Sequence, residues 1–197
     1  WKLLQDAGYD VREIDLLTED IDYGNAQLII INGPQYDFTG IEADVNEIKK
    51  IDDFLDNVGS LMIFMDASAR SKQNFSNLDE LLNEWGISYG ESVVYDPSSC
   101  INVDGTALIS EYTKEGNGST LTKSMRTLSN VPRTIVNYTM PIYVTYNNGE
   151  SASIDQGTRD VSSVLTSSEN AYACGFDTNE TVDTGSFNLM TLSTEQR

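Results

Sequence analysis

The feature that most constrains the fold is an alternation of two hydrophobic periods over the first 96 residues. A continuous aliphatic run within 27–32 is typical of a strand buried on both faces, and further strands are predicted at 60–66 and 91–96. Between them, apolar residues recur at helical spacing over 41–55 and 78–85. A strand–helix–strand–helix–strand order is typical of a parallel sheet with right-handed crossovers. The pattern therefore predicts an α/β fold.

Capping signals mark where these helices are expected to begin. Thr39 is followed three residues later by Glu42, as in a capping box, where the two side chains exchange hydrogen bonds with each other's backbone N–H groups. Ser76 and Asp79 repeat the pattern with a shorter acid. Before the first buried strand, 1–8 predicts a helix ended by Gly8, and 11–16 predicts a short strand.

The second half of the chain predicts mainly strands. They are expected at 106–113, 133–148, 161–168 and 185–193, with Val131-Pro132 and Met140-Pro141 as breaks and turns at 115–120 and 147–153. We expect one domain over 1–197, a three-layer α/β sandwich with a mainly parallel sheet and a β-rich second half. A boundary near 98–104 is the alternative.

Charge and composition exclude several classes of function. Thirty-one acidic against twelve basic residues give a formal net charge of −19, which disfavours nucleic acid and anionic membrane surfaces; alternatively, the charge only keeps the surface solvated. The chain has no His, so the commonest general base and metal ligand is missing. Cys100 and Cys174 form either one disulfide or two free thiols.

Polar residues follow each of the three buried strands. In an open parallel sheet, ligands bind beyond the carboxyl ends of the strands. The candidate ligand-binding residues are Asn32, Gly33, Asp66, Ser68, Arg70 and Asp96. Each also has a purely structural interpretation, in which Gly33 turns the chain and the two aspartates cap turns.

Motifs for enzyme chemistry are missing from these strand ends, which we call the rim of the predicted sheet. No nucleophile elbow follows a strand, and no glycine-rich phosphate loop is present, so we expect no catalytic residue, no metal and no cofactor. Asp66 and Asp96 as an acid–base pair remain the alternative. The segment 177–183 spaces oxygen ligands as a calcium loop does, but it lacks the Gly and Glu of an EF-hand and is expected to be a solvated loop.

An ordered series of motifs resembles a known family. "AQLIIINGPQYDFTGIEADVNEIKKIDDFLDNVGSLMIFMDAS" and "NLDELLNEWGISYGESVVYDPSS" combine a strand ending in Gly-Pro, a hydrophobic strand after a helix-ending Gly, a helix ending Trp-Gly-Ile and a strand closing on Val-Tyr-Asp. "VLTSSENAYA" adds a later Thr-Ser segment. Together they resemble the extracytoplasmic domain of ABC-transporter auxiliary proteins of the gliding-motility GldG type, mainly over 10–99.

The resemblance implies a membrane-anchored domain on the extracytoplasmic face of the cell membrane, with a fold like that of class I glutamine amidotransferases but without catalytic residues. The partners it implies are ABC permease or ATPase subunits or other membrane proteins. We also expect an extracellular glycan or a small polar ligand as candidate ligands.

The expected function is a non-enzymatic accessory or binding domain of an export or gliding-type system. A divergent hydrolase and a purely structural interaction module are the alternatives. Because 1–4 already has the character of a helix interior, and because no apolar window is long enough to cross a bilayer, we expect a soluble fragment of a longer protein.

Overall fold

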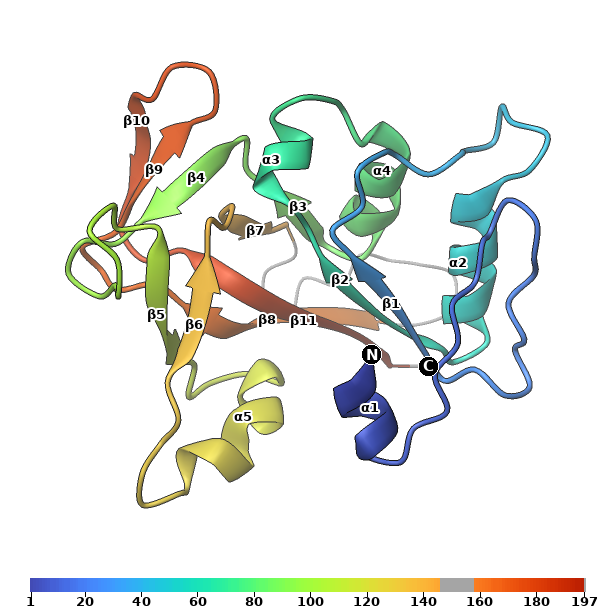
Figure 1. Ribbon diagram of the computed structural model, residues 1–197, viewed down its shortest axis with the longest axis horizontal. Helices are drawn as coiled ribbons and strands as arrows, with labels where there is room; N and C mark the ends of the chain where they lie inside the picture. Colours follow the sequence, from blue (N-terminus) through green and yellow to red (C-terminus); the bar gives the residue numbers. More distant parts are fainter. Residues whose placement is uncertain (146–157, 197) are drawn as a thin grey trace. The chain divides into compact units, whose positions relative to one another are not determined.

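The computed structural model describes residues 1–145 and 158–196 (Figure 1). The chain divides into two compact units. The first unit contains Trp1–Asn32 and Phe38–Ile63, and the second contains Gly33–Asp37 and the chain from Phe64 onward. The alternative boundary at 98–104 lies inside the second unit. A single domain over 1–197 stays a prediction.

The first unit consists of two helices, a small sheet and their connecting loops. Its elements are α1 (Lys2–Asp6), β1 (Leu28–Asn32), α2 (Glu47–Asp56) and β2 (Ser60–Phe64), the last residue of β2 being assigned to the second unit. β1 and β2 pair in parallel as a two-stranded sheet. The buried apolar residues of this unit are Leu16, Ile21, Ile31, Ile51, Phe54 and Leu55. Lys50 Nζ donates to the carbonyls of Leu16 and Glu19, both at 2.8 Å, which holds the acidic loop against α2.

The start of α2 differs from the predicted capping box. The helix begins at Glu47, and the N-cap Asn46 accepts a hydrogen bond from the N–H of Lys49 at 2.9 Å. The N–H of Glu47 donates to the Thr39 hydroxyl at 3.1 Å, and the N–H of Thr39 donates to the Glu47 carboxylate at 2.9 Å. The reciprocal exchange is therefore made by Thr39 with Glu47 and not with Glu42, because the intervening loop returns Thr39 to the helix that Asn46 starts.

The second unit is mainly antiparallel. Its helices are α3 (Ala67–Arg70), α4 (Ser76–Glu84) and α5 (Gly118–Arg126). Its strands are β3 (Ile87–Tyr89), β4 (Ser92–Tyr95), β5 (Ala107–Tyr112), β6 (Thr134–Asn137), β7 (Ile142–Val144), β8 (Thr158–Thr166), β9 (Tyr172–Gly175), β10 (Thr181–Thr184) and β11 (Asn188–Gln196). They form a six-stranded sheet in the order β3-β7-β11-β8-β5-β6 and a three-stranded sheet in the order β10-β9-β4.

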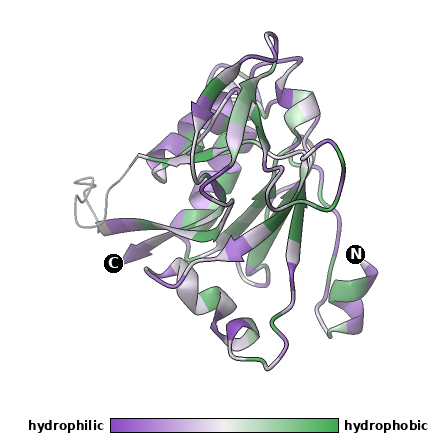
Figure 2. Cartoon of the chain, turned by 90° about the vertical axis from the view of Figure 1, so that its left-hand side faces the viewer, coloured by the Kyte–Doolittle hydropathy of each residue, from purple (hydrophilic) through white to green (hydrophobic). Residues whose placement is uncertain are grey.

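The core of the second unit lies between strands that are distant in sequence. Val94, Leu108, Val164, Ala173 and Phe187 are all buried in one cluster. Green hydrophobic segments are interspersed with purple hydrophilic ones along the strands (Figure 2). β8 and β11 pair along their whole length, from Asn188 opposite Thr166 to Gln196 opposite Thr158.

The predicted parallel sandwich, and with it the amidotransferase-like fold, is wrong. Among the residues described, only β1 and β2 are parallel, and the other sheets are antiparallel. β3 pairs with β7 and β4 pairs with β9, both antiparallel. Only Gly90 and Glu91 separate β3 from β4, whereas a parallel neighbour requires a crossover of a dozen or more residues. The strand at 92–95 was therefore predicted correctly, but its partner was not.

Other elements follow the sequence to different degrees. α1, α4, β5, β6, β7, β8 and β11 confirm predicted elements. The strand predicted at 11–16 is wrong, because no strand of the described chain pairs with it. Part of the turn predicted at 115–120 belongs to α5, and the turn at 147–153 lies outside the described residues. No helix in the described chain is long and apolar enough to cross a membrane.

Candidate functional site

The predicted rim residues divide between different places in the structure. Asn32 ends β1 in the first unit, and the other five belong to the second unit. Asp66, Ser68 and Arg70 lie together at α3, where Asp66 is the N-cap. Asp96 follows β4 and accepts hydrogen bonds from Ser99 in the same loop and from Ser168 after β8. The parallel rim expected to collect these side chains does not exist, because β4 belongs to an antiparallel sheet.

Asp66 holds the start of α3. Its Oδ1 accepts the N–H of Ser68 at 2.8 Å, and its Oδ2 accepts Nε2 of Gln35 at 3.3 Å. The same Gln35 amide donates to the carbonyl of Gly33 at 3.0 Å, and Gly33 has a φ of +61°, which favours glycine. The backbone N–H of Ser68 holds the pKa of Asp66 below its ordinary value. The capping interpretation of Asp66 is thus the one that the geometry supports.

Arg70 is occupied by an ion pair. Its two terminal nitrogens each donate to one carboxylate oxygen of Asp79 at 2.7 Å, a bidentate arrangement, and its side chain is 8% exposed. The guanidinium also lies over the rings of Phe75 and Tyr89, at 5.5 and 5.6 Å from the centroids. Burial raises the pKa of Tyr89 to about 12, so this phenol stays protonated at neutral pH.

Asp79 was expected to cap α4, but it binds Arg70 instead. The N-terminal N–H groups of α4 are satisfied by Asp37, whose two carboxylate oxygens accept the N–H of Asn77 at 2.9 Å and of Leu78 at 3.1 Å. Asp37 is about forty positions earlier in the chain, so no local motif could have revealed this cap.

Asp96 is completely buried and links two segments of the chain. Its Oδ2 accepts the N–H of Ser168 at 2.9 Å, and its Oδ1 accepts the Ser168 hydroxyl at 3.0 Å and the N–H of Ser99 at 3.1 Å. The hydrogen bonds of Asp96 and those of Asp66 share no residue. Asp96 fixes the loop after β4 to the Thr-Ser segment that follows β8.

A buried arginine was missed by the sequence analysis. Arg159 on β8 pairs with Glu195 on β11 at 3.1 Å and with Glu84 of α4 at 3.0 Å, and its guanidinium lies 4.2 Å from the ring centroid of Trp85. The side chain of Arg159 is 4% exposed and that of Glu195 is 7% exposed. The only sequence signal is an isolated Arg at the start of a strand, and such a residue is usually at the surface.

Three tyrosines, of which Tyr138 is exposed and Tyr95 and Tyr172 are half-buried, form a second feature that the sequence did not reveal. The rings of Tyr95 and Tyr172, opposite each other on β4 and β9, stack at a centroid distance of 5.4 Å with an interplanar angle of 7°. Tyr138, with a φ of +50°, is 44% exposed. The N–H of Val94, next to Tyr95, donates to the carbonyl of Thr139, next to Tyr138, at 2.9 Å, so the backbones that carry these two tyrosines are neighbours. Burial raises the pKa of Tyr95, and Cys174, Tyr138, Tyr172 and Asp104 raise it further. We call Tyr95, Tyr138 and Tyr172 the tyrosine cluster.

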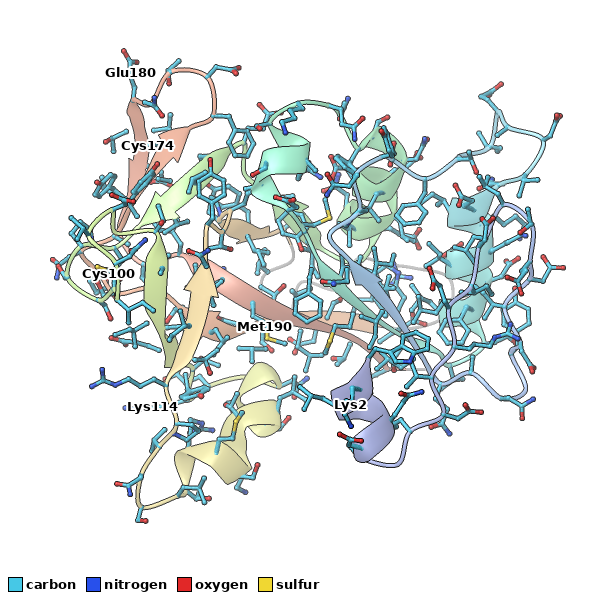
Figure 3. The ribbon with its side chains drawn as sticks, in the orientation of Figure 1. Lys2, Cys100, Lys114, Cys174, Glu180 and Met190 are labelled. Carbon is cyan, nitrogen blue, oxygen red and sulfur yellow. The ribbon has the colours of Figure 1, made fainter. Side chains whose placement is uncertain are left out.

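The cysteines and the acidic groups form no recognisable metal centre in the described chain. Cys100 lies on the loop after β4 and Cys174 on β9, both labelled in Figure 3, and both are free thiols. Within residues 1–145 and 158–196, no group of three or more Cys, Asp or Glu side chains has a metal-binding arrangement. The segment 177–183, considered above as a calcium loop, connects β9 to β10 and includes part of β10.

No protein-family model matches the chain, and no curated protein matches it significantly.

Proposed function

We propose that this chain is a non-enzymatic interaction domain of an ABC-type transport system, acting on the extracytoplasmic face of the membrane. The proposal that the domain is not an enzyme is supported by the contacts of the candidate polar residues. Asp66 caps α3, Arg70 binds Asp79 through two hydrogen bonds, and buried Asp96 binds Ser168 and Ser99. All three side chains therefore hold the fold together.

The tyrosine cluster supports binding to a protein partner. Tyrosine combines a large apolar ring with a polar hydroxyl and is enriched in protein interfaces. Tyr95 and Tyr172 stack on adjacent strands, so their rings are held in place before a partner arrives, which lowers the entropy cost of binding. The cluster is accordingly the proposed contact surface.

The transport part of the proposal depends on the ordered motifs of residues 10–99 and 164–173. The amidotransferase-like fold, which the resemblance also implied, no longer supports it, because the main sheets are antiparallel. The proposal therefore depends on these ordered sequence motifs and on the structural contacts made by Asp66, Arg70 and Asp96.

Co-purification tests the proposed partner. The protein is produced with a candidate ABC ATPase–permease pair from the same genome, and the complex is isolated from membranes. We expect a stable complex with the wild type and about tenfold weaker recovery with Tyr138→Ser combined with Tyr172→Ala. Leu121→Ala, which changes an exposed apolar residue on α5, is the matched control and should bind normally. Equal recovery of the tyrosine variant would show that the cluster is not the contact surface.

A turnover assay tests the non-enzymatic part. The purified protein is incubated with ester, amide and glycoside substrates, alongside Asp66→Ala. We expect no hydrolysis above background from either protein. Hydrolysis by the wild type that disappears in Asp66→Ala would replace the proposal by the hydrolase alternative.

A further inference from the structure

The outer edge of β1 has backbone groups that point away from its sheet partner, β2. In the β1–β2 ladder, the N–H of Ser60 donates to the carbonyl of Gln27 at 3.0 Å, and the N–H of Gly33 donates to the carbonyl of Phe64 at 2.8 Å. In a parallel strand, backbone groups of alternate residues point to opposite sides. Gln27, Ile29, Ile31 and Gly33 therefore face β2, and the N–H and C=O groups of Leu28, Ile30 and Asn32 point away from it.

Nothing in the described chain pairs with that outer edge. β2 is the only sheet neighbour of β1 among the described strands. The side chains on one face of β1 are also uncovered, with Leu28 46% and Ile30 39% exposed, whereas Ile31 on the other face is 9% exposed. Parallel strands normally lie inside larger sheets covered on both faces, and an isolated pair of strands is marginal. The edge is thus a ready template for another strand.

Backbone chemistry and charge together select the occupant. Outward N–H and C=O groups in alternation are satisfied by an extended polypeptide. The first unit has thirteen acidic and four basic residues, a net charge of −9, so a second copy of this unit is repelled and a segment with basic flanks is attracted. We propose that the outer edge of β1 binds an extended apolar segment flanked by Lys or Arg, which adds to the sheet as a third strand.

This inference concerns only the first unit and does not depend on the tyrosine cluster. The two proposals can therefore fail separately, because the variants that test them lie in different units.

A peptide-binding measurement tests the proposal. The probe is a fluorescently labelled peptide of alternating Val and Thr between two Lys pairs, and its anisotropy is followed with the full 197-residue chain. Ile30→Pro removes one outward N–H without removing a hydrogen bond to β2, and Ile30→Thr is the matched control that keeps this N–H. We expect the wild type and Ile30→Thr to bind alike and Ile30→Pro to bind about tenfold more weakly.

Two further measurements test the charge argument, and they do not depend on the Ile30→Pro variant, which could misfold. The same peptide with Glu pairs should bind at least about tenfold more weakly, and added salt should weaken the Lys peptide. Ile30→Lys, which keeps the backbone N–H, should weaken the Lys peptide and strengthen the Glu peptide.

Several results would overturn the proposal. They are no binding of the Lys peptide by the wild type, equal binding by Ile30→Pro, or equal binding of the two peptides. Sedimentation that shows a wild-type dimer, lost in Ile30→Pro, would also overturn it by making a second copy the occupant.

Discussion

Replacement of Asp96 is the sharpest test of the structural role given to the strand-end carboxylates. The side chain is 0% exposed and accepts three hydrogen bonds, two from backbone N–H groups and one from the Ser168 hydroxyl. Hydrogen bonds to charged groups contribute about 1.5–3 kcal/mol each, and each buried donor left unpaired costs about 1–3 kcal/mol. Because these effects are not additive, we expect Asp96→Ala to lower the free energy of unfolding of the second unit by about 3–5 kcal/mol.

Asp96→Asn should have a smaller effect. It keeps the size of the side chain but replaces one acceptor oxygen by a donor, so a loss of about 2 kcal/mol is expected. Asp177→Asn, an exposed carboxylate on the β9–β10 connection, is the matched control and should change stability by less than about 0.5 kcal/mol.

The assay uses the two tryptophans of the chain. In a Trp1→Phe background, Trp85 alone reports the unfolding of the second unit in urea. With a slope of about 2 kcal/mol per molar urea, Asp96→Ala should lower the midpoint by about 2 M. A midpoint within about 0.3 M of the parent would refute the reasoning, since a buried carboxylate with three donors cannot be removed at so small a cost.

Three further predictions address other contacts. Arg159→Met should lower the free energy of unfolding by about 3–5 kcal/mol, because it breaks the buried ion pair between Arg159 and Glu195, and adding Glu195→Leu should recover part of the loss in the same urea assay. Glu47→Ala should cost about 1 kcal/mol in thermal unfolding, because it removes the acceptor of the Thr39 N–H, and Glu42→Ala should cost nothing measurable; the reverse order would contradict the observed cap. Asp66 has a lowered pKa in the folded state, so its contribution to the free energy of unfolding should be complete above its ordinary pKa of 3.8 and disappear as the pH falls through the folded pKa. Asp66→Asn should therefore make the free energy of unfolding less dependent on pH in an acid titration. An unchanged pH dependence would contradict this prediction.

Local elements were largely readable from the sequence, because hydrophobic period and helix-ending glycines act over a few residues. The helix at Ser76–Glu84 and the strand at Ser60–Phe64 were predicted from such patterns. The pairing of the strands could not be predicted, because backbone hydrogen bonds form between any two strands and leave no pattern in the sequence that identifies the partner. Thus Ser92–Tyr95 was predicted as a strand, but its antiparallel neighbour, Tyr172–Gly175, was missed.

The candidate site shows the same limit for side chains. Asp66 and Asp96 were selected because carboxylates after strands often bind ligands. The neighbouring residues were equally consistent with the alternative, in which each aspartate caps a turn. For Asp96, the structural role became visible only through its contact with Ser168, seventy-two positions away. Arg159 and Trp85 could not be paired from sequence for the same reason, since one lies in β8 and the other follows α4.

The path of the chain between the two units has a practical consequence. The backbone passes from one unit to the other at Asn32–Gly33, at Asp37–Phe38 and at Ile63–Phe64. The short return of Gly33–Asp37 delivers the carboxylate that caps α4. No single cut can release an intact half of this protein, and a truncation that begins at Phe64 would leave the first turn of α4 without Asp37.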